Sequence, residues 1–240
     1  MDKRIKLTEV LQNDKRLSKL VERLDAGYGT YEDVSQIAKG LGGVIGDEMA
    51  IAYDEDALRL YLTDGHEVVS VLAVTAQQNL NDAARIGMKP LTTKVPKAQI
   101  DNLIQSISSV GEEFLGDKVQ SAVPSFMMKM VDDISKYNRD FQAKSGMKPI
   151  IVRTWSGSYS SHDTRHTDWC ADLAGTYEYG KEPKDVYKRH EGCTCTVEYF
   201  PNKDAQGRIT ALAKGEIDRE GVLWNTRPDT LSKRLSKLGK

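Results

Sequence analysis

Three cysteines and one histidine lie close together in the C-terminal part of this 240-residue chain. Cys170, His190, Cys193 and Cys195 form the pattern C-x19-H-x2-C-x-C, in which a single turn can present both His190 and Cys193. Thiolate sulfur and imidazole nitrogen are preferred zinc ligands, and a structural zinc site takes four of them in a tetrahedron. The pattern therefore predicts a structural zinc site closed by these four side chains.

The spacing of the cysteines leaves alternatives open. Side chains at positions i and i+2 of an extended strand share one face at about 7 Å, so Cys193 and Cys195 reach one metal ion only if the chain bends between them. An odd number of cysteines argues against complete pairing. Reduced, buried thiols remain possible, as does one disulfide from Cys170 to Cys193 or Cys195.

A second group of candidate ligands precedes the cysteines. His162 and His166 have the i, i+4 spacing that places two side chains on one helix face, and Asp163 lies between them. The metalloprotease pattern H-E-x-x-H needs a glutamate beside the first histidine, and this chain has none there. A metal-dependent hydrolase or nuclease that uses these three residues is the alternative to a purely structural site.

Residues around the cysteines follow one another in a characteristic order. They are, in turn, Arg153-Thr154-Trp155, Asp163-Thr164-Arg165, Cys170 with Leu173 and Gly175, Tyr177-Glu178-Tyr179, and RHEGCTCTVEYFP at 189–201. In order and spacing, this block resembles the Mu protein F-like head-morphogenesis domain, or minor capsid protein domain, of tailed bacteriophages. The commonest form of its last motif has Asn or Asp where this chain has Gly192, and a basic residue where it has Thr194.

The resemblance implies a virion protein that acts in head assembly. Members of the family lie in few copies at or near the portal vertex, or inside the head. The expected partners are therefore the portal protein, the major capsid protein or both, and the expected locations are the virion and, during assembly, the host cytoplasm. Because only about 40 residues follow Pro201, too few for an ordinary catalytic domain, we expect the structural form and no enzyme.

The elements that must position these residues begin with a helical region. Apolar residues recur at helical spacing up to Gly146-Met147-Lys148-Pro149, a sequence that does not continue a helix well. Thr30 with Asp33 is typical of a helix start. The predicted helical segments are 34–41, 49–61, 68–80, 100–107 and 126–141.

Three local features predict interruptions in these helices. Gly40, Gly42 and Gly43 each cost about 1 kcal/mol of helix propensity, so the first long helix is expected to break or kink there. Asp64-Gly65 is typical of a turn. Pro124 suits the first turn of the helix that carries 126–141.

The remainder of the chain favours short strands and loops. β-branched and aromatic residues predict strands at 149–155 and 194–200, with a short helical turn at 167–173 and another carrying Val186 and Tyr187. The fold class is therefore α+β. We expect a mainly helical region at 1–148, the head-morphogenesis domain with short β-strands at 149–202, and a C-terminal tail with a short basic helix at 203–240.

The tail combines leucines with positive charge. Leu231, Leu235 and Leu238 have helical spacing, and the basic residues near them are Arg227, Lys233, Arg234, Lys237 and Lys240. Such a helix can contact the phosphates of packaged DNA or bind a partner such as the portal. The preferred interpretation is a solvated or frayed terminal helix.

Composition excludes several other classes. The net charge is −1 and the mean hydropathy is −0.50, so a strongly basic nucleic-acid coat is not expected. No apolar run reaches the roughly 18 residues that span a bilayer, and the first residues lack the apolar core of a secretory signal. We therefore expect no membrane partner.

Overall fold

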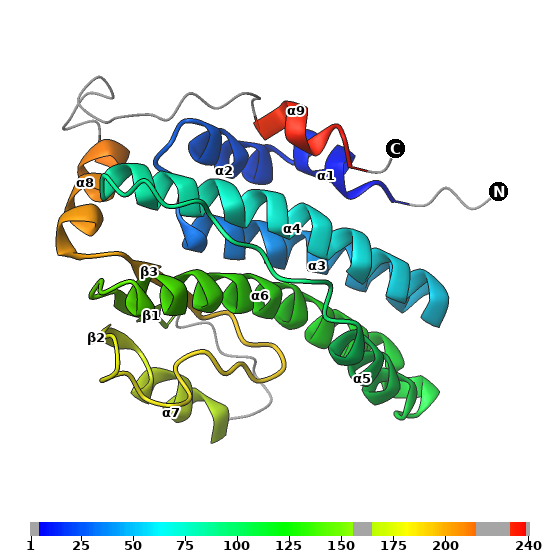
Figure 1. The fold of residues 1–240 in the computed structure, drawn as a ribbon. Coiled ribbons are helices and arrows are strands. Elements are labelled where there is room, and N and C mark those ends of the chain that lie inside the picture. Colours follow the sequence, from blue (N-terminus) through cyan, green and yellow to red (C-terminus); the bar gives the residue numbers. More distant parts are fainter. Residues whose placement is uncertain (1–4, 156–164, 215–230, 239–240) are drawn as a thin grey trace.

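The computed structural model describes residues 5–155, 165–214 and 231–238 (Figure 1). Its helices are α1 (Leu7–Asn13), α2 (Lys15–Asp25), α3 (Tyr31–Ile51), α4 (Glu55–Ala83), α5 (Lys97–Ser108), α6 (Glu112–Lys144), α7 (Arg165–Asp172), α8 (Lys203–Lys214) and α9 (Leu231–Leu235). Its strands are β1 (Ile150–Thr154), β2 (Gly175–Glu178) and β3 (Thr196–Phe200). The expected α+β class is confirmed.

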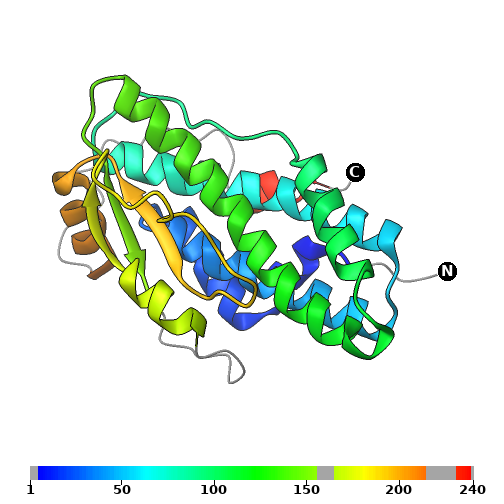
Figure 2. The same cartoon turned by 90° about the horizontal axis from the view of Figure 1, so that it is seen from below.

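Three long helices, α3, α4 and α6, lie side by side and form the body of the molecule (Figures 1 and 2). The strands form an antiparallel sheet in the order β2-β1-β3, and β3 packs against α3 and α6. In the central strand β1, Arg153 is paired with Gly175 of β2 and Val197 of β3. One continuous hydrophobic core joins the helices and the sheet, and the predicted division into three regions stays a prediction.

A buried hydrogen-bond network also joins the sheet to the helices. The hydroxyls of Tyr31 on α3 and Tyr199 on β3 both donate to the Gln77 Oε1 atom on α4, at 2.8 and 2.5 Å. The Gln77 amide in turn donates to Asn81 Oδ1 at 2.8 Å. Because buried polar groups are costly unless they are paired, this network fixes how β3 is seated on the helices.

The glycine-rich segment does not interrupt its helix. The Thr30 side chain and Asp33 form the expected capping box, but α3 then runs unbroken from Tyr31 to Ile51. A Cβ atom on Gly42 would lie 2.6 Å from the Pro124 Cα, and one on Gly46 would lie 3.2 Å from the Gln120 Cα. The prediction of a break was wrong because close packing against α6 offsets the low helix propensity of glycine.

The other two predicted interruptions were also wrong. Asp64 and Gly65 lie inside α4, and the turn before that helix comes earlier, where the Asp54 side chain accepts from the Ala57 amide at 2.9 Å. Pro124 lies inside α6, which begins at Glu112. Local preferences for turns and helix starts were outweighed by the burial of continuous apolar faces.

The C-terminal half follows the predicted pattern in part. The strand expected at 149–155 and the helical turn at 167–173 correspond to β1 and α7, whereas β3 begins only at Thr196. Residues 184–187 form turns and no helix. Strand β2 and helix α8 were not predicted.

The C-terminal helix α9 is neither solvated nor frayed. Leu231 and Leu235 are buried in the main core, and α9 packs against α2 and α4. The Arg234 Nη2 atom donates to Thr75 Oγ1 of α4 at 2.8 Å. The preferred interpretation was therefore wrong, because the leucines have a partner surface on the chain itself. Within the described ranges, no helix has the length and apolar character needed to span a membrane.

Candidate metal centre

Cys170, His190 and Cys193 come together although 19 residues separate the first two in sequence. Their ligand atoms all lie within 4.8 Å of one another, and these three side chains could hold a metal ion. Cys170 is carried by α7, while His190 and Cys193 belong to the loop that leads into β3. All three cysteines are free and buried, so the disulfide alternative is not formed in this structure.

Cys195 belongs to the same buried cluster of thiols. Its thiol donates a hydrogen bond to Cys193 and also lies beside Cys170. The chain around Cys193 and Cys195 is irregular, because β3 starts only after them. Cys195 is not among the three residues whose ligand atoms lie within 4.8 Å of one another, so its approach to a shared metal ion stays a prediction.

A tight turn presents His190 and Cys193 to the same point. The Cys193 amide donates to the His190 carbonyl at 3.1 Å, and Gly192 between them has φ +72°. This left-handed conformation is easy for glycine, and among other residues Asn and Asp adopt it most readily. The glycine at this position therefore suits the turn in the same way as the Asn or Asp of the family motif.

The turn is fixed on α6 through its two middle residues. The Glu191 carboxylate accepts from the Lys118 ammonium and from the Ser121 hydroxyl, both at 2.5 Å. The Gly192 amide donates to the Ser121 carbonyl at 3.3 Å. The ligands on this turn are thus held against a long helix before any ion binds.

Arg189 attaches the same loop to α6 from within the core. Its guanidinium forms a buried ion pair with Asp132 of α6, with nitrogen–oxygen distances of 2.5 and 2.9 Å. A third nitrogen donates to the Cys195 carbonyl at 2.5 Å. This buried pair therefore sets the path of the backbone from His190 to Cys195.

The imidazole of His190 is oriented for metal binding. Its Nδ1 atom lies 2.7 Å from the Glu191 carbonyl oxygen, which only accepts, so Nδ1 carries the proton. The Nε2 atom then faces the Cys170 sulfur with its lone pair, at 3.1 Å. A metal-ligating histidine commonly donates its other N–H to a carbonyl in this way.

The thiols differ in their readiness to ionise. The hydrogen bond from Cys195, with the nearby Arg189 guanidinium, lowers the pKa of Cys193 to about 4. Donating that hydrogen bond, together with burial, raises the pKa of Cys195, and burial raises the pKa of Cys170. Without metal, Cys193 is therefore the thiolate of the cluster, and an incoming cation would displace protons from the other two.

The donor set fits zinc better than a hard cation. Sulfur and imidazole nitrogen suit Zn²⁺, whereas Mg²⁺ and Ca²⁺ prefer oxygen ligands. The fixed imidazole tautomer and the hydrogen-bonded loop supply the surrounding contacts that such sites need.

The other predicted motif residues shape the neighbourhood of the cluster. Trp155, the residue after β1, is 36% exposed, whereas Leu173 is buried just after α7. The Tyr177 hydroxyl donates to the Leu173 carbonyl at 3.1 Å, and a Cβ atom on Gly175 would lie 3.0 Å from that hydroxyl. Leu173 and Gly175 thus belong to the tight connection from α7 to β2.

Several predicted residues cannot be placed. His162 and Asp163 lie outside the described residues, and so do the side chains of Arg165 and His166 at the start of α7. The alternative hydrolase site therefore stays a prediction.

Sequence reasoning gave no role to the charged residues that surround the thiols, although Arg153 and Arg189 lie within the motif quoted above. The side chains of Arg153, Arg189 and Asp132 are all buried there, and each is distant in sequence from at least one of its partners. Arg153 did carry a signal, because strand alternation places it on the same face as the core residue Ile151.

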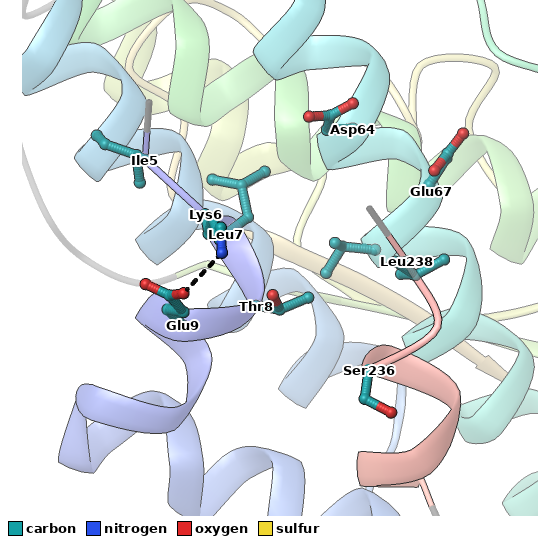
Figure 3. Close-up of a pocket in the computed structure, with 10 residues that line it drawn as sticks. Ile5, Lys6, Leu7, Thr8, Glu9, Asp64, Glu67, Ser236 and Leu238 are labelled. Carbon is teal, nitrogen blue, oxygen red and sulfur yellow. Dashed lines mark ion pairs between the residues drawn. The ribbon is translucent and has the colours of Figure 1, made fainter. Parts of the chain in front are cut away.

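A separate pocket of about 550 Å³ lies where α1, α4 and the end of α9 meet (Figure 3). Asp64 and Glu67 of α4 are among the residues that line it, and Lys6 pairs with Glu9 at 3.3 Å. None of its lining residues belongs to the thiol cluster. The pocket therefore has no part in the candidate metal centre.

Comparison of the chain with protein-family models, curated proteins and solved structures found no match.

Proposed function

We propose that this chain is a zinc-stabilised structural protein of a tailed-phage head. It would act in head assembly and be present in few copies per virion. The observation that supports the zinc centre is the convergence of Cys170, His190 and Cys193 within 4.8 Å. The proposed place in the virion is supported by the order of residues from Arg153 to Pro201, which resembles the head-morphogenesis domain.

In this proposal Cys195 supplies the fourth ligand. Four protein ligands close the tetrahedron and leave no position for a reactive water, which is the arrangement of a structural zinc site. The ion would join α7 to the loop before β3, so it would cross-link the two sides of the small sheet. No step of chemistry is assigned to it.

Metal analysis tests the zinc proposal. Protein purified under reducing conditions, without chelator, is expected to hold one zinc ion per chain, and Cys193→Ser should lose it. His66→Gln is a suitable control, because His66 is a buried histidine of α4 whose Nε2 contacts Thr93 and no cysteine. Zinc well below one equivalent in the folded parent protein would contradict the proposal.

A peptide survey of purified virions tests the proposed location. We expect peptides of this chain in the virions of its phage, at far lower abundance than the major capsid protein, with the portal or major capsid protein as contact. Packaged DNA remains a candidate partner through Lys233 and Lys237, which are exposed on and just after α9. Absence from a sensitive survey would count against a virion role.

The hydrolase alternative has its own distinguishing result. If the metal-loaded protein cleaved nucleic acid or peptide, and His166→Ala abolished that activity while the zinc content stayed at one equivalent, a second, catalytic centre would replace the purely structural proposal.

A further inference from the structure

Arg153 is a fully buried cation at the edge of the thiol cluster. It lies on the central strand β1 and is 2% exposed. Its Nη1 atom donates to the carbonyls of Val186 and Lys188, at 2.6 and 2.9 Å. Its Nη2 atom lies 3.7 Å from the Cys170 sulfur, and its guanidinium lies over the Trp169 ring, 5.5 Å from the centroid.

No carboxylate among the described residues forms an ion pair with Arg153. The other two deeply buried arginines differ in this respect, because Arg189 pairs with Asp132 and Arg139 pairs with Asp140 and Glu182. Carbonyl oxygens satisfy N–H groups but carry no net charge. A buried, unpaired charge is strongly disfavoured, so a negative group is expected beside Arg153.

Once zinc is bound, the thiol cluster keeps a negative charge only if all three cysteines bind as thiolates. Three thiolates and a neutral imidazole around Zn²⁺ carry a net charge of −1, by simple addition of formal charges. Two thiolates, the imidazole and a water would give a neutral centre and leave Arg153 unbalanced. Arg189 and Asp132 form an ion pair and together add no net charge to the centre, although the Asp132 carboxylate also acts electrostatically on Arg153.

We propose that Arg153 is the counter-charge of a zinc centre in which Cys170, Cys193 and Cys195 all bind as thiolates. This inference rests on the proposed zinc site and assigns to Arg153 the role of a positioning residue. Its N–H group, aimed at Cys170, would orient that sulfur, and its charge would stabilise the anionic centre in surroundings from which water is excluded.

The test is a competition for zinc between the folded protein and a chromophoric chelator. Arg153→Met removes the charge but keeps much of the side-chain volume, and we expect the zinc affinity to fall about 10- to 100-fold, as for other residues that support metal ligands. Arg153→Lys keeps the charge, so its zinc affinity should be closer to that of the parent protein than the affinity of Arg153→Met is. Arg139→Met is the matched control, since it removes a buried arginine that pairs elsewhere, and its zinc affinity should be unchanged.

The outcomes separate this inference from the zinc proposal itself. If the parent protein binds no zinc, both fail. If the parent binds one zinc and folded Arg153→Met binds it equally well, the zinc centre stands and the role of Arg153 is refuted. Equal losses of zinc affinity in Arg153→Met and Arg139→Met would also refute the role of Arg153. Removal of any buried arginine would then weaken zinc binding. Should Arg153→Met not fold, Arg153→Lys decides: an affinity loss as large as that of Cys170→Ser would rule out a role of charge.

Discussion

Gly42 of α3 lies directly against Pro124 of α6, so closely that a methyl group on Gly42 would be 2.6 Å from the Pro124 Cα atom. The two helices pack along this line, and Gly46 continues it one turn later against Gln120. Because β3 and the loop that carries His190 both pack on α3 or α6, this close approach also determines where the candidate metal centre lies.

Gly42→Ala and Gly43→Ala are expected to change stability in opposite directions. A Cβ atom on Gly43 meets nothing within 4 Å, so alanine there should raise the free energy of unfolding by about 0.5–1 kcal/mol through helix propensity. Alanine at Gly42 must push apart two backbones and should lower it by about 1–3 kcal/mol. Urea unfolding of the two variants measures both effects. A higher free energy of unfolding for Gly42→Ala would show that the close contact with Pro124 is not formed.

Asp132→Asn is expected to destabilise the protein far more than Asp133→Asn does. Asp132 and Arg189 are both almost fully buried, and breaking a buried pair leaves an uncompensated charge at a cost of about 3–5 kcal/mol. Asp133 pairs with Lys129 at the surface, where such pairs contribute about 0–1 kcal/mol. Urea unfolding compares the two variants. A similar, small loss of unfolding free energy in both would contradict a buried ion pair between Asp132 and Arg189. Asp132→Asn should also lower the zinc content, because Arg189 holds the Cys195 carbonyl.

Glu198 on β3 is expected to make the protein less stable as the pH rises. Burial, followed by the negative charges of Glu32 and Asp33, raises the pKa of Glu198 to about 8. Its stabilising effect is complete below the unfolded pKa and is lost between about pH 4.5 and 8, at up to about 1.4 kcal/mol per pH unit.

The glutamine side chain of Glu198→Gln resembles a protonated carboxyl group. This variant should therefore lose the decrease in unfolding free energy with rising pH. Urea unfolding at pH values from 5 to 8 measures this pH dependence in the parent protein and in Glu198→Gln. Glu178→Gln, at an exposed position of β2, is the control. Parallel curves for the parent and Glu198→Gln would mean that Glu198 is ionised in the folded protein throughout.

Leu235→Ala tests the position of the C-terminal helix. Leu235 is 5% exposed and packs in the main core, so its truncation should cost about 2–5 kcal/mol of unfolding free energy. Lys233→Ala, at an exposed position of the same helix, should change it by less than about 0.5 kcal/mol. If Leu235→Ala also changes the unfolding free energy by less than about 0.5 kcal/mol, α9 is a frayed end and does not pack in the core.

The pattern of apolar residues predicted the fold class and most helices, and it predicted β1 and α7. It failed where tertiary contacts outweighed local preference. Gly42, Gly65 and Pro124 are ordinary signals of interruption, yet each lies within a helix where α3, α4 and α6 pack closely. A single sequence carries no sign of which glycine will face another backbone.

The candidate site shows the same limit. The spacing predicted four ligands, and three of them, Cys170, His190 and Cys193, meet within 4.8 Å. The residues that support them are separated widely in sequence, as Asp132 and Arg189 are. Their pairing depends on how the sheet is seated against α6, which local patterns do not determine.

X-ray absorption at the zinc edge tests the central claim most directly. For the metal-loaded protein we predict three sulfur ligands at about 2.3 Å and one nitrogen at about 2.0–2.1 Å, from Cys170, Cys193, Cys195 and His190. Cys195→Ser should reduce the sulfur count by one. A shell of two sulfurs with oxygen or water in the parent protein, or a protein that retains no zinc, would contradict the account of a closed, three-thiolate centre.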